Sequence, residues 1–298
     1  MNISDEQDDK ELDRGISDKA SSGLDVRPLT THAGAEIFGL GLTEVLSAQA
    51  YDEIRAAMHH YGVVFFRDQN LSSEQYLRFA ANFGAPKVNP LTPTVPGFSA
   101  ISRLIKEASH ETSTGDMWHA DHTFLPSPMN TILLAVEVPE YGGDTLWLNT
   151  RAAYEQLPEQ TKSEIADLHA LHSHSFLIKD LDYAKKHKQE HGVEEMNQEF
   201  SAAPTKMHHH PVVRKHPHTG AEALFINPGY TVKFQGWSRE QSLELLNRLY
   251  EHCLQPEFQC RFRWRAGSIA MWDNSHTWHF AVNDYAGQRR EMHRIVLQ

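Results

Sequence analysis

Hydrophobic residues recur with a helical period in several segments of the chain. Over residues 48–61 the apolar side chains, Ile54 and Met58 among them, fall three or four positions apart, which predicts an amphipathic helix. Ser72 and Ser238 are each followed three residues later by a glutamine, the pattern of a capping box at a helix start. We therefore expect a helix over 48–61 and one after each of these two serines.

Strand patterns dominate the C-terminal third. Between Phe258 and Trp264 every second residue is apolar, which is the period of a strand with one buried face. Other apolar runs predict further strands, at 63–66, 131–138, 268–272, 277–282 and 291–297. Short strands with helices at one side indicate a mainly β fold with flanking helices, an antiparallel sandwich or barrel. A parallel doubly wound sheet is disfavoured, and no glycine-rich nucleotide loop is present.

Composition narrows the class of protein. The 298 residues include 28 Lys and Arg against 39 Asp and Glu, a net charge of -11, which argues against a nucleic-acid surface. Residues 1–25 hold eight acids and three bases, so we expect a disordered acidic tail followed by a single domain over 26–298. No apolar run approaches the roughly 20 residues of a membrane helix, and no secretory pattern occurs. We therefore expect a cytoplasmic protein that binds neither nucleic acid nor membrane.

Histidine is unusually abundant, with 20 in the chain. His119 and Asp121 flank Ala120, and side chains two positions apart on a strand project from the same face. An imidazole and a carboxylate placed in this way offer two ligands to one metal ion. A second histidine would complete the two-histidine, one-carboxylate set of non-haem Fe(II) oxygenases. The motif alone leaves a purely structural role open.

A second group of polar residues lies near the C-terminus. His279 precedes the turn-rich segment 283–287 and Arg290 follows it, so we expect the two residues on neighbouring antiparallel strands. Strand parity places Arg290 and Arg294 on one face. A buried guanidinium needs an anionic partner, and its planar fork suits a carboxylate or a sulfonate. The alternative is that these arginines form salt bridges with acids of the same sheet.

Five motifs in order resemble one known family. They are His119-Ala120-Asp121, Gly142-Gly143-Asp144-Thr145-Leu146-Trp147, His210-Pro211-Val212-Val213-Arg214 with His216-Pro217 and Thr219-Gly220, Trp272-Asp273-Asn274, and His279 with Arg290 and Arg294. Over residues 27–298 this order and spacing resemble the Fe(II)/2-oxoglutarate-dependent taurine dioxygenase family, which includes phenoxyalkanoate herbicide dioxygenases. The resemblance implies a double-stranded β-helix, or jelly roll, flanked by helices. It also implies a homo-oligomer, a dimer or a tetramer.

The resemblance implies roles for individual residues. His119, Asp121 and His279 would hold Fe(II). Thr145 and Arg290 would bind the far carboxylate of the co-substrate 2-oxoglutarate, and O2 would be the second co-substrate. Arg294 matches the arginine that grips the taurine sulfonate. The implied reaction hydroxylates a small anionic organic substrate and decarboxylates 2-oxoglutarate to succinate and CO2, and the product then collapses to an aldehyde and sulfite.

Two positions depart from the taurine pattern. Asn89 stands where the family has a histidine before a proline, and Gly115 stands where an asparagine lies four residues before the first iron ligand. We still expect Asn89 in the substrate site together with Arg294. Taurine itself is disfavoured, and the expected substrate is another alkyl sulfonate, with an aryloxyalkanoate or an alkyl sulfate as alternatives. Two other classes stay open, a zinc hydrolase with the same ligands and a non-catalytic anion sensor.

Other residues compete for the metal. His276 is the alternative to His279 as the distal ligand, but the family spacing of 11 residues to Arg290 favours His279. Asp273 is a weaker alternative to Asp121, because no histidine lies two residues away from it. A further group of histidines resembles a second metal site, although we favour a solvated loop: His208, His209, His210, His216 and His218.

Overall fold

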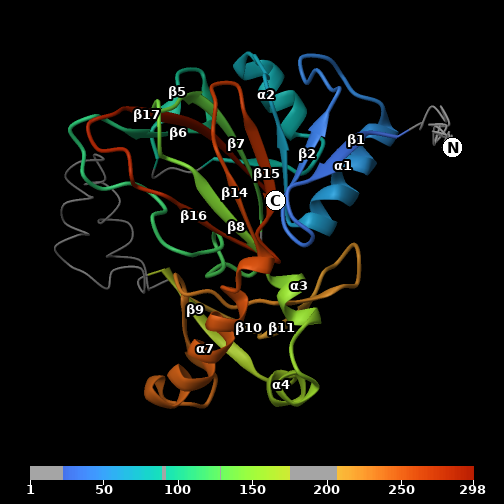
Figure 1. The fold of residues 1–298 in the computed structure, drawn as a ribbon, viewed down its shortest axis with the longest axis vertical. Coiled ribbons are helices and arrows are strands. Elements are labelled where there is room, and N and C mark those ends of the chain that lie inside the picture. The colour runs from blue at the N-terminus through green and yellow to red at the C-terminus, as the bar shows by residue number, and fades with distance from the viewer. Residues whose placement is uncertain (1–22, 89–91, 128, 175–206) are drawn as a thin grey trace, which may run out of the picture.

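The computed structural model describes residues 23–88, 92–127, 129–174 and 207–298. Two sheets of unequal size face each other as a sandwich (Figure 1). The large sheet has nine strands in the order β1-β2-β3-β15-β7-β17-β6-β5, with β4 also paired to β17. Its strands are β1 (Asp25–Pro28), β2 (Ala35–Phe38), β3 (Val63–Phe66), β4 (Pro86–Lys87), β5 (Thr94–Val95), β6 (Phe98–Lys106), β7 (Asn130–Glu137), β15 (Ile269–Asp273) and β17 (Arg290–Leu297).

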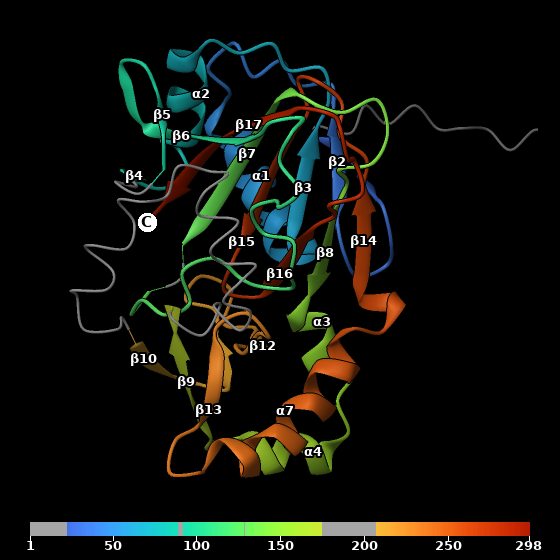
Figure 2. The same ribbon diagram turned by 90° about the vertical axis from the view of Figure 1, so that its left-hand side faces the viewer.

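The small sheet has three strands in the order β14-β8-β16. Its strands are β14 (Gln259–Phe262), β8 (Thr145–Asn149) and β16 (Thr277–Ala281). A smaller layer lies at one end of the sandwich (Figure 2), with the elements α3 (Thr150–Glu155), α4 (Glu159–Ile165), β9 (His169–Ser173), β10 (Met207–Pro211), β11 (Val213–Lys215), β12 (Glu222–Leu224), β13 (Thr231–Phe234), α7 (Arg239–Cys253) and the short 3-10 helix at Pro256–Phe258. In the described part of the chain, no helix is long and apolar enough to cross a membrane.

The predicted helices form where their capping patterns place them. Helix α1 spans Ala48–Tyr61, the predicted range, and ends at Gly62, whose φ of 79° lies in the region that favours glycine. Helix α2 (Ser73–Ala80) begins after Ser72 and α7 after Ser238, and in both cases the capping box is complete. Local sequence therefore determines the starts of these helices.

Alternation along the strands divides the core into two layers. One face of the large sheet, with side chains such as Val64 and Met271, packs on α1 and α2. The other face, with side chains such as Phe65 and Met292, packs on the small sheet through a group of large aromatic residues. The fold is thus mainly β with flanking helices, as predicted, and the inner face is the one that the functional residues share.

Three expectations need correction or fall outside the described residues. Strands β16 and β17 do not pair, because β16 joins β8 in the small sheet and β17 joins β7 and β6 in the large one. The segment 283–287 therefore crosses the sandwich and does not close a hairpin. Asp25, placed in the acidic tail, is the first residue of β1. Asn89 lies outside the described residues.

Candidate active site

Two histidines and a carboxylate converge between the sheets. His119 pairs with His279 of β16 as an isolated bridge, with backbone N–H···O distances of 3.1 and 2.7 Å. Asp121 Oδ1 lies 3.7 Å from His119 Nε2 and 3.9 Å from His279 Nε2, and all three side chains are buried. The structure thus brings together the three predicted metal ligands, although His279 lies far along the chain from His119 and Asp121.

The protonation state of these side chains suits metal binding. The His119 Nδ1–H donates to the carbonyl of Met117 at 2.7 Å, which leaves the Nε2 lone pair facing Asp121. Burial, together with His119, lowers the pKa of His279 to about 3 and keeps that imidazole neutral. Burial alone would raise the pKa of Asp121, but the electrostatic effect of neighbouring groups, the charged Arg294 among them, lowers it well below its usual range. Imidazole nitrogens and a carboxylate are donors that Fe(II) accepts.

Thr145 and Arg290 lie near each other although they come from opposite sheets. The indole N–H of Trp264 donates to the Thr145 hydroxyl at 2.9 Å, and the Arg290 guanidinium lies 5.9 Å from the centre of the same indole. Arg290 is buried, and its Nε and one terminal nitrogen have no hydrogen-bond partner among the described residues. Burial lowers the pKa of Arg290, and Tyr285 offsets this only in part. This buried guanidinium fits the carboxylate of an anionic ligand.

The glycines before Thr145 fix its position. Gly142 has a φ of 74°, and a Cβ on it would lie 2.5 Å from Asp284 Oδ1. The Gly143 amide donates to the same carboxylate oxygen at 2.8 Å. Asp144 Oδ2 in turn accepts from the Arg261 Nε–H at 2.7 Å. The Gly-Gly-Asp motif thus ties the start of β8 to the loop that precedes β17.

Arg294 lies on the inner face of β17, as the parity argument predicted. Its guanidinium is 4.0 Å from Asp121 Oδ1, and its Nε has no hydrogen-bond partner among the described residues. Salt bridges within the sheet form on the opposite face, where Glu291 binds Arg289 and Arg103 at 2.7 Å each. The salt-bridge alternative therefore applies to the neighbouring Arg289. Arg290 forms no ion pair with the described residues, and Arg294 pairs only with Asp121, at 4.0 Å.

Aromatic and strained residues surround the metal ligands. Phe124 packs against Tyr230 at 5.2 Å, and Tyr230 lies 6.3 Å from His119, so one wall of the site is aromatic. Gly115 has a φ of 85°, and a Cβ on it would come within 3.2 Å of the His119 ring. His122 adopts a φ of 58°, rare for a residue with a side chain, directly after the ligand Asp121. Because glycine has no side chain, position 115 leaves space beside the metal ligands.

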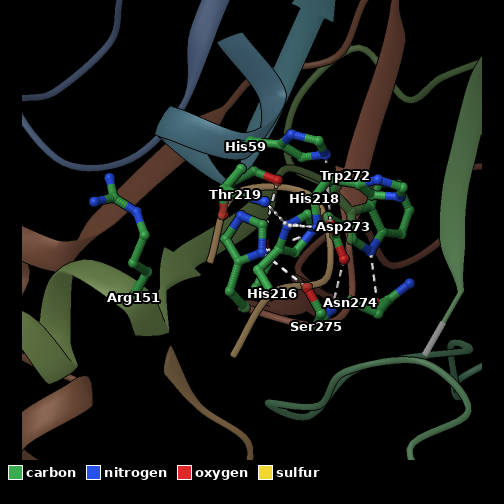
Figure 3. Close-up of polar contacts among 12 residues, drawn as sticks. His59, Arg151, His216, His218, Thr219, Trp272, Asp273, Asn274 and Ser275 are labelled. Atoms are coloured by element: carbon green, nitrogen blue, oxygen red, sulfur yellow. Dashed lines mark hydrogen bonds and ion pairs between the residues drawn. The ribbon is translucent and has the colours of Figure 1, made fainter. Parts of the chain in front are cut away.

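A second cluster of histidines surrounds Asp273 (Figure 3). His216 Nε2 is 2.8 Å from Asp273 Oδ2, and His59 Nε2 is 4.0 Å from the same oxygen. The backbone N–H groups of His218 and Thr219 donate to His216 Nδ1 at 3.3 and 3.2 Å. Since Nδ1 accepts these hydrogen bonds, the Nε2–H of His216 is the group that donates to Asp273. This arrangement has the residue types of a metal site, but the nitrogen nearest the carboxylate carries a proton.

This cluster also settles the competition among the histidines. His276 lies 3.7 Å from Asp273 and hydrogen-bonds to Ser275, so it belongs to the second cluster, and His279 is the histidine beside Asp121. The expected loop at 208–210 is wrong, because these residues form β10 and pair with β9. Sequence reasoning missed His59, since nothing in helix α1 marks it as a partner of β15. It also missed Thr131, whose hydroxyl donates to Asp121 Oδ2 at 3.0 Å.

Comparison with known proteins agrees with this geometry. A family model described as "Taurine catabolism dioxygenase TauD, TfdA family" matches residues 25–296. The chain is 38% identical over 282 residues to an alpha-ketoglutarate-dependent sulfate ester dioxygenase of Pseudomonas putida, covering 92% of this chain and 89% of that protein. It is 36% identical over 276 residues to an alkylsulfatase of Acinetobacter baylyi, covering 92% and 84%. The chain belongs to the TauD/TfdA family.

Solved structures of the TauD/TfdA family share the fold. A taurine dioxygenase from Burkholderia xenovorans superposes with a TM-score of 0.76 at 33% identity, covering 92% of this chain and 89% of that one. The protein AAD-2, in complex with Mn(II) and N-oxalylglycine, gives 0.72 at 29% identity, covering 92% and 96%. The predicted jelly roll is thereby confirmed. As a TauD/TfdA enzyme with a His-Asp-His cluster, the protein is a 2-oxoglutarate-dependent dioxygenase that uses Fe(II), and neither the hydrolase nor the sensor alternative is retained.

Proposed function

We propose that this dioxygenase hydroxylates the sulfate-bearing carbon of a small alkyl sulfate ester. Arg294 carries the proposal, because its partly buried guanidinium lies 4.0 Å from Asp121 with its Nε unpartnered among the described residues. An anionic group bound to Arg294 would hold the adjoining carbon next to the metal ligands. The aromatic wall of Phe124 and Tyr230 supports an apolar body for the same molecule.

Relatives support the choice among anionic groups. The sequence by itself favoured an alkyl sulfonate, but the two relatives at 36% and 38% identity are named an alkylsulfatase and a sulfate ester dioxygenase. A sulfonate stays the second candidate, because the chain is also 31% identical to an alpha-ketoglutarate-dependent sulfonate dioxygenase of Saccharomyces cerevisiae. Both groups present three oxygens of one anion to a guanidinium, so Arg294 suits either.

Each side chain has a distinct part in this proposal. His119, Asp121 and His279 would hold Fe(II) through Nε2, Oδ1 and Nε2, the atoms that face one another. Arg290 and the Thr145 hydroxyl would bind the far carboxylate of 2-oxoglutarate. When bound, Fe(II) and 2-oxoglutarate supply the oxidising power that inserts one oxygen atom of O2 into a C–H bond, while 2-oxoglutarate becomes succinate and CO2.

The product then breaks down without further help from the chain. Its carbon carries both a hydroxyl group and the sulfate ester oxygen. The hydroxyl proton leaves, a carbonyl forms, and the carbon–oxygen bond to sulfate breaks, which yields an aldehyde and hydrogen sulfate. For a sulfonate the carbon–sulfur bond breaks and sulfite is released. We treat residues 26–298 as the single catalytic domain.

The test is 2-oxoglutarate turnover against a panel of anions. We expect alkyl sulfates to stimulate succinate release by the Fe(II)-loaded protein more than alkyl sulfonates or aryloxy carboxylates do, with sulfate and aldehyde formed in equal amounts. Arg294→Gln should abolish the stimulation and still bind 2-oxoglutarate. Arg289→Gln is the matched control, because Arg289 lies beyond the inner face and should leave the stimulation intact. Equal stimulation of Arg294→Gln and wild-type protein would overturn the proposal.

A further inference from the structure

Asn274, next to the end of β15, is a buried amide that uses all of its hydrogen-bonding capacity. Asn274 is only 1% exposed. Its Oδ1 accepts from the backbone N–H of Asp121 at 2.9 Å and from the indole N–H of Trp272 at 3.0 Å. Its Nδ2 donates to the carbonyl of Met129 at 2.7 Å and to the hydroxyl of Thr131 at 3.0 Å. An amide side chain can accept two hydrogen bonds and donate two, and Asn274 makes all four.

The hydrogen bond from Asn274 to Thr131 fixes the direction of a relay of two hydrogen bonds, which runs from Asn274 through Thr131 to Asp121. Since Thr131 Oγ1 accepts a hydrogen from Asn274, its own hydrogen is directed elsewhere, and it donates to Asp121 Oδ2 at 3.0 Å. That oxygen of the carboxylate is therefore engaged. The other oxygen, Oδ1, is the one that faces the imidazoles of His119 and His279.

Trp272 extends the same arrangement to a second metal ligand. Its indole N–H is held by Asn274, and its ring lies 4.8 Å from the ring of His279. Asp273 lies between Trp272 and Asn274 in the sequence, and its side chain points to the opposite side, toward His59 and His216 (Figure 3). Trp272 and Asn274, at the end of β15, thus contact both the carboxylate and the distal histidine of the metal cluster.

We infer that Asn274 is a positioning residue that orients the metal-binding carboxylate of Asp121, through its backbone N–H and through the Thr131 hydroxyl. The inference rests on the metal-binding role proposed for Asp121. An amide is required because one side of the group must accept and the other must donate. An ionised aspartate at 274 accepts on both sides, and a neutral one has a single proton for the two acceptors Met129 and Thr131.

The experiment measures metal affinity, not turnover. Co(II) is titrated into the metal-free protein in the absence of 2-oxoglutarate, and its visible absorption reports on the ligand set. His119→Ala identifies the part of the signal that belongs to this site. Removing a hydrogen-bond partner of a metal ligand typically costs about 10- to 100-fold in affinity. We expect losses of that size for Asn274→Asp and for Thr131→Val, which breaks the same relay at its last step.

Asn149 supplies a matched control. It is fully buried at 0% exposure, and its amide also makes four hydrogen bonds: Nδ2 donates to the carbonyls of His32 and His60, and Oδ1 accepts from the amides of Arg151 and Ala152. None of its four partners is a metal ligand. Asn149→Asp should therefore lower the melting temperature, as Asn274→Asp does, but leave the Co(II) affinity of the folded protein unchanged.

The outcomes are separable. Weaker Co(II) binding in Asn274→Asp and Thr131→Val, with normal binding in Asn149→Asp, supports the inference. Should Asn274→Asp not fold, the affinity of Thr131→Val decides. Wild-type affinity in folded Thr131→Val and Asn274→Asp, or an equal loss in Asn149→Asp, overturns it. A wild-type protein that shows no Co(II) binding dependent on His119 would instead overturn the proposed role of the metal cluster itself.

Discussion

Arg290 and Thr145 come from opposite sheets of the sandwich and meet at the indole of Trp264. Because the indole N–H donates to the Thr145 hydroxyl, the hydroxyl hydrogen of Thr145 is left to donate to another acceptor. Arg290 adds a positive charge that has no ion-pair partner among the described residues. A hydroxyl donor beside a buried guanidinium is suited to a carboxylate, and neither sheet alone creates this pair.

The first prediction concerns Arg290→Met. Loss of a buried charged contact to a ligand costs about 2–5 kcal/mol, which is about 30- to 5,000-fold in 2-oxoglutarate affinity. The ligand-free protein should be as stable as wild type or more stable, because the variant removes a buried charge without a partner. Thermal melts with and without 2-oxoglutarate measure both effects. An undiminished shift of the melting temperature on adding 2-oxoglutarate would contradict the assignment.

Gly229→Ala tests the packing behind the first histidine. A Cβ on Gly229 would lie 2.8 Å from the Cβ of His119, a contact that requires a backbone displacement at position 229 or at His119. We expect a loss of metal affinity of about 10-fold or more, which is typical when the group that orients a metal ligand is disturbed. Gly41→Ala is the control, since the nearest atom to its added Cβ is 3.9 Å away. Equal Co(II) affinities in the two variants would refute this prediction.

We predict one metal ion per chain, because the cluster around Asp273 should not bind metal. His216 already donates its Nε2–H to Asp273, so these residues should not contribute a second equivalent after chelator treatment and Fe(II) or Co(II) reloading. His216→Ala should leave the metal stoichiometry at one and lower the free energy of unfolding by about 1–3 kcal/mol, because the buried carboxylate of Asp273 loses one of its hydrogen bonds. Metal analysis and urea unfolding test this. A second equivalent that disappears in His216→Ala would show the cluster to be a metal site.

Glu291 gives a pH-dependent contribution to stability. The hydrogen bond from Arg103 lowers its pKa to about 2, against the opposing effect of burial and with help from Arg289. The unfolded-state pKa of a glutamate is about 4.3. Because the folded value is the lower one, the stabilisation is complete above about pH 5 and is lost as the pH falls through the range from about 4 to 2. We expect about 1–3 kcal/mol, since the arginines are partly exposed.

Glu291→Gln measures this contribution. The variant should be less stable than wild type in urea at neutral pH, and the two unfolding curves should converge as the pH approaches about 2. A stability difference that stays constant between neutral pH and pH 3 would assign the effect to packing and not to the charge of Glu291.

The sequence by itself determined the local structure and the chemistry. Capping patterns at Ser72 and Ser238 fixed where two helices begin, because the capping hydrogen bonds involve only nearby residues. The family resemblance grouped His119, Asp121 and His279 as one metal cluster, and strand parity placed Arg290 and Arg294 on one face. The parity inference holds because side-chain direction along β17 follows from the strand period of two, whereas His119 and Asp121 lie outside the strands.

Tertiary structure decided how these pieces meet. Strands β16 and β17 are consecutive along the chain, yet each pairs with a different sheet, and no local pattern distinguishes this from a hairpin. His59 reaches Asp273, and Thr131 orients Asp121, through contacts between segments distant in sequence. Contacts of this kind depend on distances set by the packing of whole sheets and helices, which is why the family motifs in the sequence pointed to the metal ligands but not to the residues that hold them in place.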